Sequence, residues 1–148
     1  DVHQVKVTGR RARSAAPAPS ATLTVTDGAV HVSATTLRPK GVFRFRNDGS
    51  VPHMVGLAKL VDGGTAEDVL AYVEAVLGDD STVDPTTLAS PFDDEVFGAP
   101  TAALSPGGRM LMRYALPPGD YVAVCVAADR KAVRLHLQDG EVTGVRLG

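Results

Sequence analysis

Four histidines and one cysteine are the side chains of this sequence with the clearest capacity for chemistry, either as metal ligands or in catalysis. Taken singly, each has a structural explanation. His3 lies near the start of the chain, and His31 occupies a solvent-facing position in a segment that alternates apolar and polar residues. Cys125 lies among valines, where a cysteine behaves as a small apolar residue. A lone cysteine also excludes an internal disulfide and any zinc or redox motif of the CxxC type.

The sequence contains none of the motifs that identify common catalytic sites. There is no GxSxG elbow, HExxH helix, Walker loop or GxGxxG turn, and no spacing pairs a nucleophile with a base. The acidic pairs Asp79-Asp80 and Asp93-Asp94 lack the alternating ligand spacing of a calcium loop, so we interpret them as solvated loop residues. We therefore predict that the chain is not an enzyme.

The elements that would position these side chains are mainly strands. Apolar residues alternate with polar ones in most segments after residue 20, and the turn signals Asp27-Gly28 and Asp139-Gly140 predict tight hairpins. The near-continuous apolar run over 121–127 is typical of a strand that is covered on both faces. Strand patterns lie at about residues 21–26, 30–32, 42–46, 54–60, 109–113, 121–127, 133–137 and 142–147.

One helix is expected at about residues 65–77. Thr65 and Asp68 have the spacing of a capping box, apolar residues then recur at helical spacing, and Gly78 predicts a left-handed end. Residues 79–107 are rich in loop signals that periodicity does not resolve. The sequence therefore predicts a β-sandwich of seven or eight strands with one helical insertion.

Several short motifs together resemble the cupredoxin family, the blue-copper sandwich of plastocyanin and its relatives. A turn at 47–50 precedes His53 at the start of a strand, and a segment with the PGxY motif, 116–121, leads to Cys125. The helix start at 65–69 is similar to that of a secreted bacterial branch of this family. The resemblance covers residues 21–148 and implies a Greek-key β-sandwich with His53, Cys125 and His136 in the places of the copper ligands.

The ligand set departs from the family pattern. The family's final methionine falls on Glu141, and a hard carboxylate is a poor substitute for a thioether that holds Cu(I). A tight hairpin at Asp139-Gly140 would also place His136 on a regular strand instead of a ligand loop. We therefore expect a vestigial site without a cofactor, in a binding or interaction domain. The alternative is a copper protein for electron transfer or copper delivery, with His53, Cys125, His136 and Glu141 as ligands.

Charge is distributed unevenly along the chain. The net charge is −2, yet residues 61–108 hold ten of the seventeen acidic residues and none of the fifteen basic ones. We expect this acidic region to attract a basic protein partner, and no nucleic acid. No apolar stretch is long enough to cross a membrane. Residues 1–20 are predicted to be a flexible or edge-strand segment and linker before the domain at 21–148. The resemblance implies an extracytoplasmic chain, secreted or tethered through a segment that precedes it.

Overall fold

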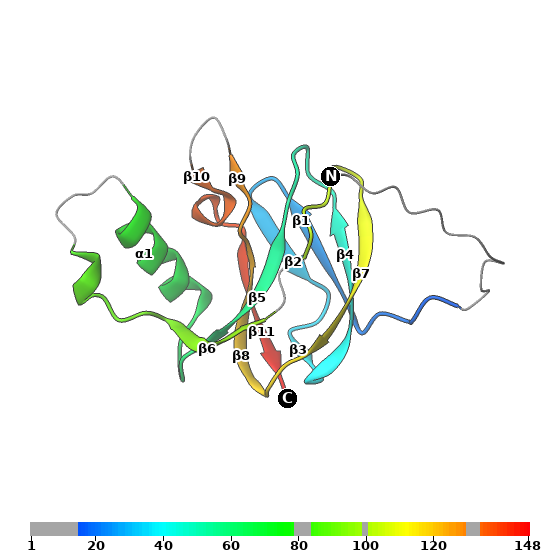
Figure 1. The fold of residues 1–148 in the computed structure, drawn as a ribbon, viewed down its shortest axis with the longest axis horizontal. Helices are drawn as coiled ribbons and strands as arrows, with labels where there is room; N and C mark the ends of the chain where they lie inside the picture. Colours follow the sequence, from blue (N-terminus) through cyan, green and yellow to red (C-terminus); the bar gives the residue numbers. More distant parts are fainter. Residues whose placement is uncertain (1–14, 79–83, 99–100, 130–133) are drawn as a thin grey trace, which may run out of the picture.

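The computed structural model describes residues 15–78, 84–98, 101–129 and 134–148, which form two facing sheets with a helix outside one of them (Figure 1). One sheet has the strand order β2-β1-β4-β7 and the other β3-β11-β8-β5-β6, while β9 and β10 form a separate pair. This mainly β sandwich confirms the predicted fold class. The strands are β1 Ala21–Thr26, β2 Ala29–Val32, β3 Thr36–Leu37, β4 Lys40–Asn47, β5 Val55–Leu60, β6 Phe92–Gly98, β7 Arg109–Ala115, β8 Gly119–Cys125, β9 Ala128–Asp129, β10 Arg134–Leu135 and β11 Val142–Leu147.

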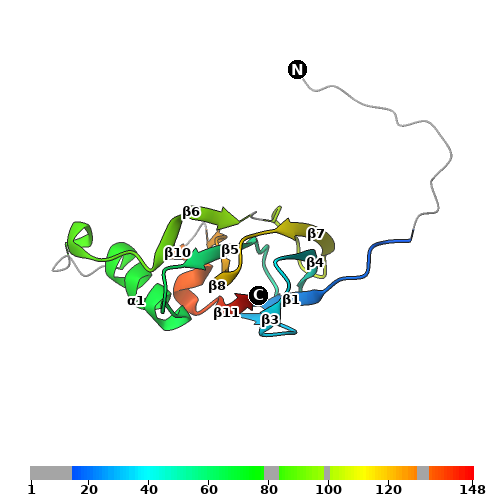
Figure 2. The same ribbon diagram turned by 90° about the horizontal axis from the view of Figure 1, so that it is seen from below.

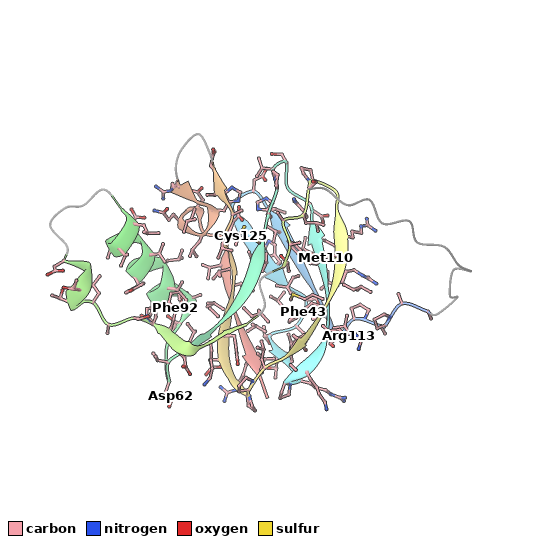
Figure 3. All side chains as sticks on the ribbon, viewed as in Figure 1. Phe43, Asp62, Phe92, Met110, Arg113 and Cys125 are labelled. Carbon is pink, nitrogen blue, oxygen red and sulfur yellow. The ribbon has the colours of Figure 1, made fainter. Side chains whose placement is uncertain are left out.

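The space between the sheets is filled by the inward-facing residues of alternating strands. In β1 buried and half-buried residues alternate along the whole strand, as a strand with one covered face requires. Phe43 and Phe45 of β4 are fully buried, and Figure 3 shows Phe43 between the sheets. The ring of Phe43 stacks on Tyr114 of β7 with ring centres 4.3 Å apart. These contacts form the main core of the sandwich.

Strand β8 is buried on both of its faces, as its apolar run predicts. Tyr121 and Cys125 point into the core between the sheets, whereas Val122 and Val124 pack toward the helix on the outer face. The hydroxyl of Tyr121 donates to the carbonyl oxygen of Pro117 at 2.9 Å, which ties the start of the strand to the preceding turn. Cys125 is therefore placed by a rigid central strand.

The helix α1, Ala66–Leu77, covers the outer face of the five-stranded sheet. The predicted capping box between Thr65 and Asp68 is present. The predicted left-handed end at Gly78 is wrong, because this residue is extended, with φ −73°. A side chain at Gly78 would instead collide with the carbonyl oxygen of Glu74, so close approach explains the glycine.

Strand β6 lies in the segment that periodicity does not resolve. It pairs antiparallel with β5, with a register shift between Ala58 and Leu60, and runs along the edge of the five-stranded sheet (Figure 2). Edge strands with charged residues lack a strict apolar alternation, which is why the sequence pattern is weak here.

The predicted hairpin at Asp139-Gly140 is wrong. Strand β10 ends at Leu135, and His136–Asp139 form a short 3-10 turn. Gly140 is left-handed, with φ 94°, but it ends this turn by donating its N–H to the carbonyl oxygens of His136 and Leu137. His136 consequently lies at the start of a tight turn and not on a regular strand.

Candidate metal centre

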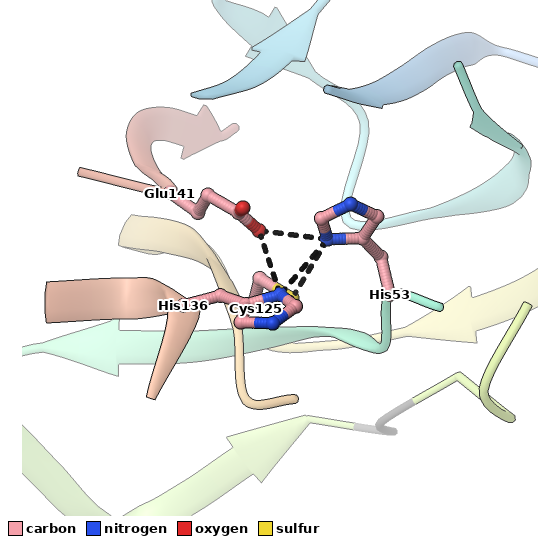
Figure 4. Close-up of side chains that lie close together, drawn as sticks. All are labelled: His53, Cys125, His136 and Glu141. Atoms are coloured by element: carbon pink, nitrogen blue, oxygen red, sulfur yellow. Dashed lines mark hydrogen bonds and ion pairs between the residues drawn. The ribbon is translucent and has the colours of Figure 1, made fainter. Parts of the chain in front are cut away.

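Four side chains from separate elements lie close together (Figure 4). His53 lies in the loop between β4 and β5, Cys125 ends β8, His136 begins the 3-10 turn, and Glu141 directly precedes β11. All four are buried, with exposed fractions of 0%, 0%, 7% and 2% in that order. One potential ligand atom of each residue lies within 4.8 Å of those of the other three. The structure thus brings together all four residues that the family resemblance names.

The four ligand atoms are Nδ1 of His53, Nδ1 of His136, Sγ of Cys125 and Oε2 of Glu141. Nδ1 of His53 lies 2.9 Å from the Glu141 oxygen, 3.1 Å from Nδ1 of His136 and 3.5 Å from the sulfur. Nδ1 of His136 lies 3.7 Å from the sulfur and 3.6 Å from the Glu141 oxygen. Metal–ligand bonds of about 2.0–2.3 Å in tetrahedral geometry separate the ligand atoms by about 3.3–3.8 Å. The donor set therefore has nearly the spacing that a metal ion requires.

The loop that carries His53 is held by Asn47, which is fully buried. Its side-chain N–H groups donate to the carbonyl oxygens of Val51 and Leu104, both at 2.7 Å, and its side-chain oxygen accepts from the N–H of Gly49 at 2.8 Å. His53 also exchanges two backbone hydrogen bonds with Leu104, at 3.1 and 2.8 Å. The backbone of the first histidine is consequently fixed from both sides.

Cys125 is held by its neighbours in the sheet. It pairs with Val55 of β5, and its N–H donates to the carbonyl oxygen of Glu141 at 3.0 Å. Burial, and to a smaller extent the Glu141 carboxylate, raises the pKa of the thiol to about 12. At neutral pH the thiol therefore keeps its proton until a cation displaces it.

The turn at Asp27-Gly28, which the sequence predicts, contacts two of the four residues from outside, and sequence reasoning missed this contact. Oδ1 of Asp27 lies 3.2 Å from Nε2 of His53, and the N–H of Gly28 donates to Oε1 of Glu141 at 3.0 Å. The hydroxyl and N–H of Ser50 donate to the Asp27 carboxylate and lower its pKa to about 2. The only sequence signal for this contact is the Asp27-Gly28 turn itself, because the residues that it contacts lie far away along the chain.

No protein-family model matches this chain, and no curated protein matches it. A solved structure that resembles it is the dithionite-reduced auracyanin of the photosynthetic bacterium Roseiflexus castenholzii. The two are 20% identical with a TM-score of 0.51, over 86% of this chain and 94% of that one. This chain has the cupredoxin fold.

Two further solved structures resemble this cupredoxin fold less closely. Auracyanin B is 20% identical with a TM-score of 0.49, over 91% of this chain and 92% of that one. Auracyanin A of Chloroflexus aurantiacus, described as a "blue" copper protein, is 16% identical with a TM-score of 0.44, over 86% of this chain and 99% of that one.

The expectation of a vestigial site without a cofactor is wrong. It assumed that a hairpin holds His136 on a strand, whereas the 3-10 turn directs the His136 side chain to His53 and Cys125. It also treated Glu141 as a poor substitute for the family's methionine, yet the carboxylate is buried and lies beside both imidazoles. A buried carboxylate with two imidazoles and a thiol favours copper over an empty core.

Other residues named by the sequence reasoning lie elsewhere. His31 is exposed on β2, and His3 lies outside the described residues. No helix in the described part of the chain is long and apolar enough to cross a membrane.

Several acidic residues between 61 and 108 make contacts within the molecule. Asp68 caps α1, a carboxylate oxygen of Asp93 lies 2.8 Å from Nζ of Lys59, and one of Glu74 lies 3.8 Å from the Arg134 guanidinium. Asp79 and Asp80 lie outside the described residues, as do the side chains of Asp94 and Glu95.

Proposed function

We propose that this chain is a copper protein that carries single electrons. Its ligands would be Nδ1 of His53, Nδ1 of His136, Sγ of Cys125 and Oε2 of Glu141. The observation that carries the proposal is the convergence of these four buried donor atoms within 4.8 Å of one another. The fold alone would not carry it, because one fold hosts many functions.

The donor set fits copper well. Two imidazoles and a thiolate are the donors of blue-copper sites, and bound copper supplies a reversible one-electron step. In the fourth position Glu141 offers a hard, anionic oxygen where a soft thioether would favour Cu(I). We therefore expect Glu141 to favour Cu(II) and to give a lower reduction potential than a thioether in that place.

Burial favours electron transfer over copper delivery. A delivery site must release its ion to another protein, which is easier when the ligands are exposed. Here His53 and Cys125 are fully buried, and both are anchored by backbone hydrogen bonds to neighbouring segments. His136 has the largest exposed fraction of the four, 7%, so we propose that electrons enter and leave the site at this ligand.

The remaining parts of the proposal concern the setting of the protein. We infer that it is not an enzyme, because every residue of the cluster can be assigned to holding the ion and none to a substrate. We also propose an extracytoplasmic location, which the family resemblance implies, and a protein redox partner. The acidic surface of α1, with Glu67 exposed, would suit a basic partner, and binding would then weaken with salt.

A copper titration of the purified chain tests the proposal. We expect uptake of a single Cu(II) per chain, with an intense visible absorption band from thiolate-to-copper charge transfer. Cys125→Ser should abolish the band, because a hydroxyl oxygen cannot replace the thiolate donor. His31→Ala is the matched control, since it removes an exposed imidazole on β2 that is not part of the cluster, and it should leave the band unchanged. The proposal would be ruled out if the parent protein and Cys125→Ser took up equal amounts of copper and neither showed the band.

A second measurement separates electron transfer from delivery. The copper-loaded protein is reduced with dithionite and dialysed against a Cu(I) chelator, then reoxidised. We expect the copper to stay bound and the visible band to return. Transfer of the ion to the chelator on reduction would instead favour copper delivery.

A further inference from the structure

The turn between β1 and β2 reaches the proposed copper site from outside. Oδ1 of Asp27 lies 3.2 Å from Nε2 of His53, the ring nitrogen opposite the one that faces the cluster. The Asp27 side chain is half exposed, with an exposed fraction of 50%, while the imidazole is fully buried. A surface carboxylate thus contacts the far side of a buried ligand.

The Asp27 carboxylate is held in this position by Ser50. The N–H of Ser50 donates to both carboxylate oxygens, at 2.9 and 3.0 Å, and its hydroxyl donates to one of them at 2.6 Å. An exposed aspartate without such contacts would sample several rotamers, and its contact with the imidazole would be transient. Three hydrogen bonds from one residue make the contact with His53 persistent.

Gly49 leaves the space that this contact needs. A Cβ atom at this position would lie 2.7 Å from Nε2 of His53 and would collide with Oδ1 of Asp27. Any larger residue would therefore move the carboxylate away from the buried ring. The loop before His53 is shaped to admit the carboxylate.

The same turn also contacts Glu141. The N–H of Gly28 donates to Oε1 of Glu141, which leaves Oε2 to face the two imidazoles. Gly28 is left-handed, with φ 93°, and lies against the turn at Gly140, where a Cβ atom would be 3.5 Å from the Gly28 carbonyl oxygen. One short turn consequently orients two of the four proposed ligands.

We propose that Asp27 is a positioning residue for the copper site, acting through Nε2 of His53, an inference that rests on the proposed function. By accepting a hydrogen bond from Nε2–H, the carboxylate keeps the proton on that nitrogen and leaves the Nδ1 lone pair free for the metal. It also orients the ring and makes the imidazole a stronger donor. The stronger donor stabilises Cu(II) more than Cu(I), because Cu(II) carries the larger charge.

Asp27→Asn tests this inference, because the amide keeps the shape of the carboxylate and loses its charge. We expect Cu(II) affinity to fall about 10- to 100-fold. Cu(I) affinity should fall less, and every tenfold difference between the two losses raises the reduction potential by about 59 mV. Asp48→Asn is the matched control, because this exposed neighbour pairs with Arg46 at 2.6 Å and should leave both affinities and the potential unchanged.

Two more variants separate positioning from a merely structural role. Ser50→Ala removes the shortest of the three hydrogen bonds that hold the Asp27 carboxylate, and Gly49→Ala displaces the carboxylate, so both should raise the potential in the same direction as Asp27→Asn. A structural role would lower the free energy of unfolding without changing the reduction potential.

The outcomes for the two proposals can be told apart. If the parent protein shows the copper band and Asp27→Asn keeps its copper affinities and reduction potential, Asp27 does not position the site and the proposed function stands. If the parent protein shows no band, both proposals fail.

Discussion

His53 and His136 direct the same ring nitrogen, Nδ1, at the same point, but different kinds of structure hold them. His53 is fully buried and is contacted on its second ring nitrogen by Asp27, while its loop is tied to Leu104 by backbone hydrogen bonds. His136 reaches the surface slightly and starts a local 3-10 turn that ends at Gly140. The first histidine is therefore held by contacts between distant segments. The second is held by its own turn and by the N–H that it donates to the carbonyl oxygen of Ala127 at 2.9 Å.

The largest expected difference between them is in stability. His53→Ala removes a fully buried ring and leaves the Glu141 carboxylate without its nearest partner, which should lower the free energy of unfolding by about 3–5 kcal/mol. His136→Ala removes a ring at the edge of the cluster and should cost about 1–2 kcal/mol. Urea unfolding of the metal-free variants measures both losses, with His31→Ala as a control expected to stay within about 0.5 kcal/mol of the parent. Equal losses at the two histidines would contradict the comparison.

Asn47 provides a test of the long-range support of His53. Asn47→Ala removes the side-chain donor to the Val51 carbonyl oxygen and one of the two donors to the Leu104 carbonyl oxygen, both in part-buried hydrogen bonds. We expect a loss of about 2–3 kcal/mol in the free energy of unfolding. The neighbouring Asp48→Ala removes an exposed ion pair and should cost less than about 1 kcal/mol. A similar cost for the two variants would show that Asn47 does not hold the loop.

The features that sequence patterns predicted are local in the chain. The turn at Asp27-Gly28 follows from two adjacent residues, and the capping box of Thr65 from residues three positions apart. The burial of Cys125 follows from the apolar run of β8. Each depends on periodicity or turn chemistry within one segment, where sequence is most informative.

The errors concern short sequences that fit more than one backbone geometry equally well. A glycine with positive φ suits a two-residue hairpin and the end of a 3-10 turn alike, so Asp139-Gly140 could not distinguish them. The predicted direction of the His136 side chain depended on which of the two geometries was chosen. The approach of Asp27 to His53 depends on the parallel pairing of β1 with β4, which brings together segments that no local pattern connects.

Gly140 provides the corresponding test on the side of His136. Its φ of 94° is strained for any residue with a Cβ atom, so Gly140→Ala should cost about 1–2 kcal/mol in the free energy of unfolding. The matched control is Gly144→Ala in β11, where a Cβ atom meets no neighbour and should cost nothing. We also expect Gly140→Ala to weaken copper binding by displacing the start of the turn at His136. Unchanged affinity would show that this turn does not set the position of the ring.

Acid should weaken the contact between Asp27 and His53, and we expect this to be the smallest of the four predicted effects on stability. Hydrogen bonds from Ser50 lower the pKa of Asp27 from its ordinary 3.8 to about 2 in the folded protein. A carboxyl group with a lowered folded pKa stabilises the folded state above its unfolded pKa, and this contribution is lost as the pH falls through the folded value. The difference in unfolding free energy between the parent protein and Asp27→Asn should therefore be constant above about pH 5 and should shrink between about pH 4 and pH 2.

Ser50→Ala sharpens this test, because it removes the main cause of the lowered pKa while Asp27 remains. The side chain should then titrate closer to its ordinary value, and the acid-dependent part of the difference should become smaller. Unfolding curves recorded across this pH range measure the effect in all three proteins. If the difference in unfolding free energy between the parent protein and Asp27→Asn instead stays constant down to pH 2, the hydrogen bonds from Ser50 to the Asp27 carboxylate do not stabilise the folded protein. The contact with His53 would then depend on the shape of the Gly49 loop alone.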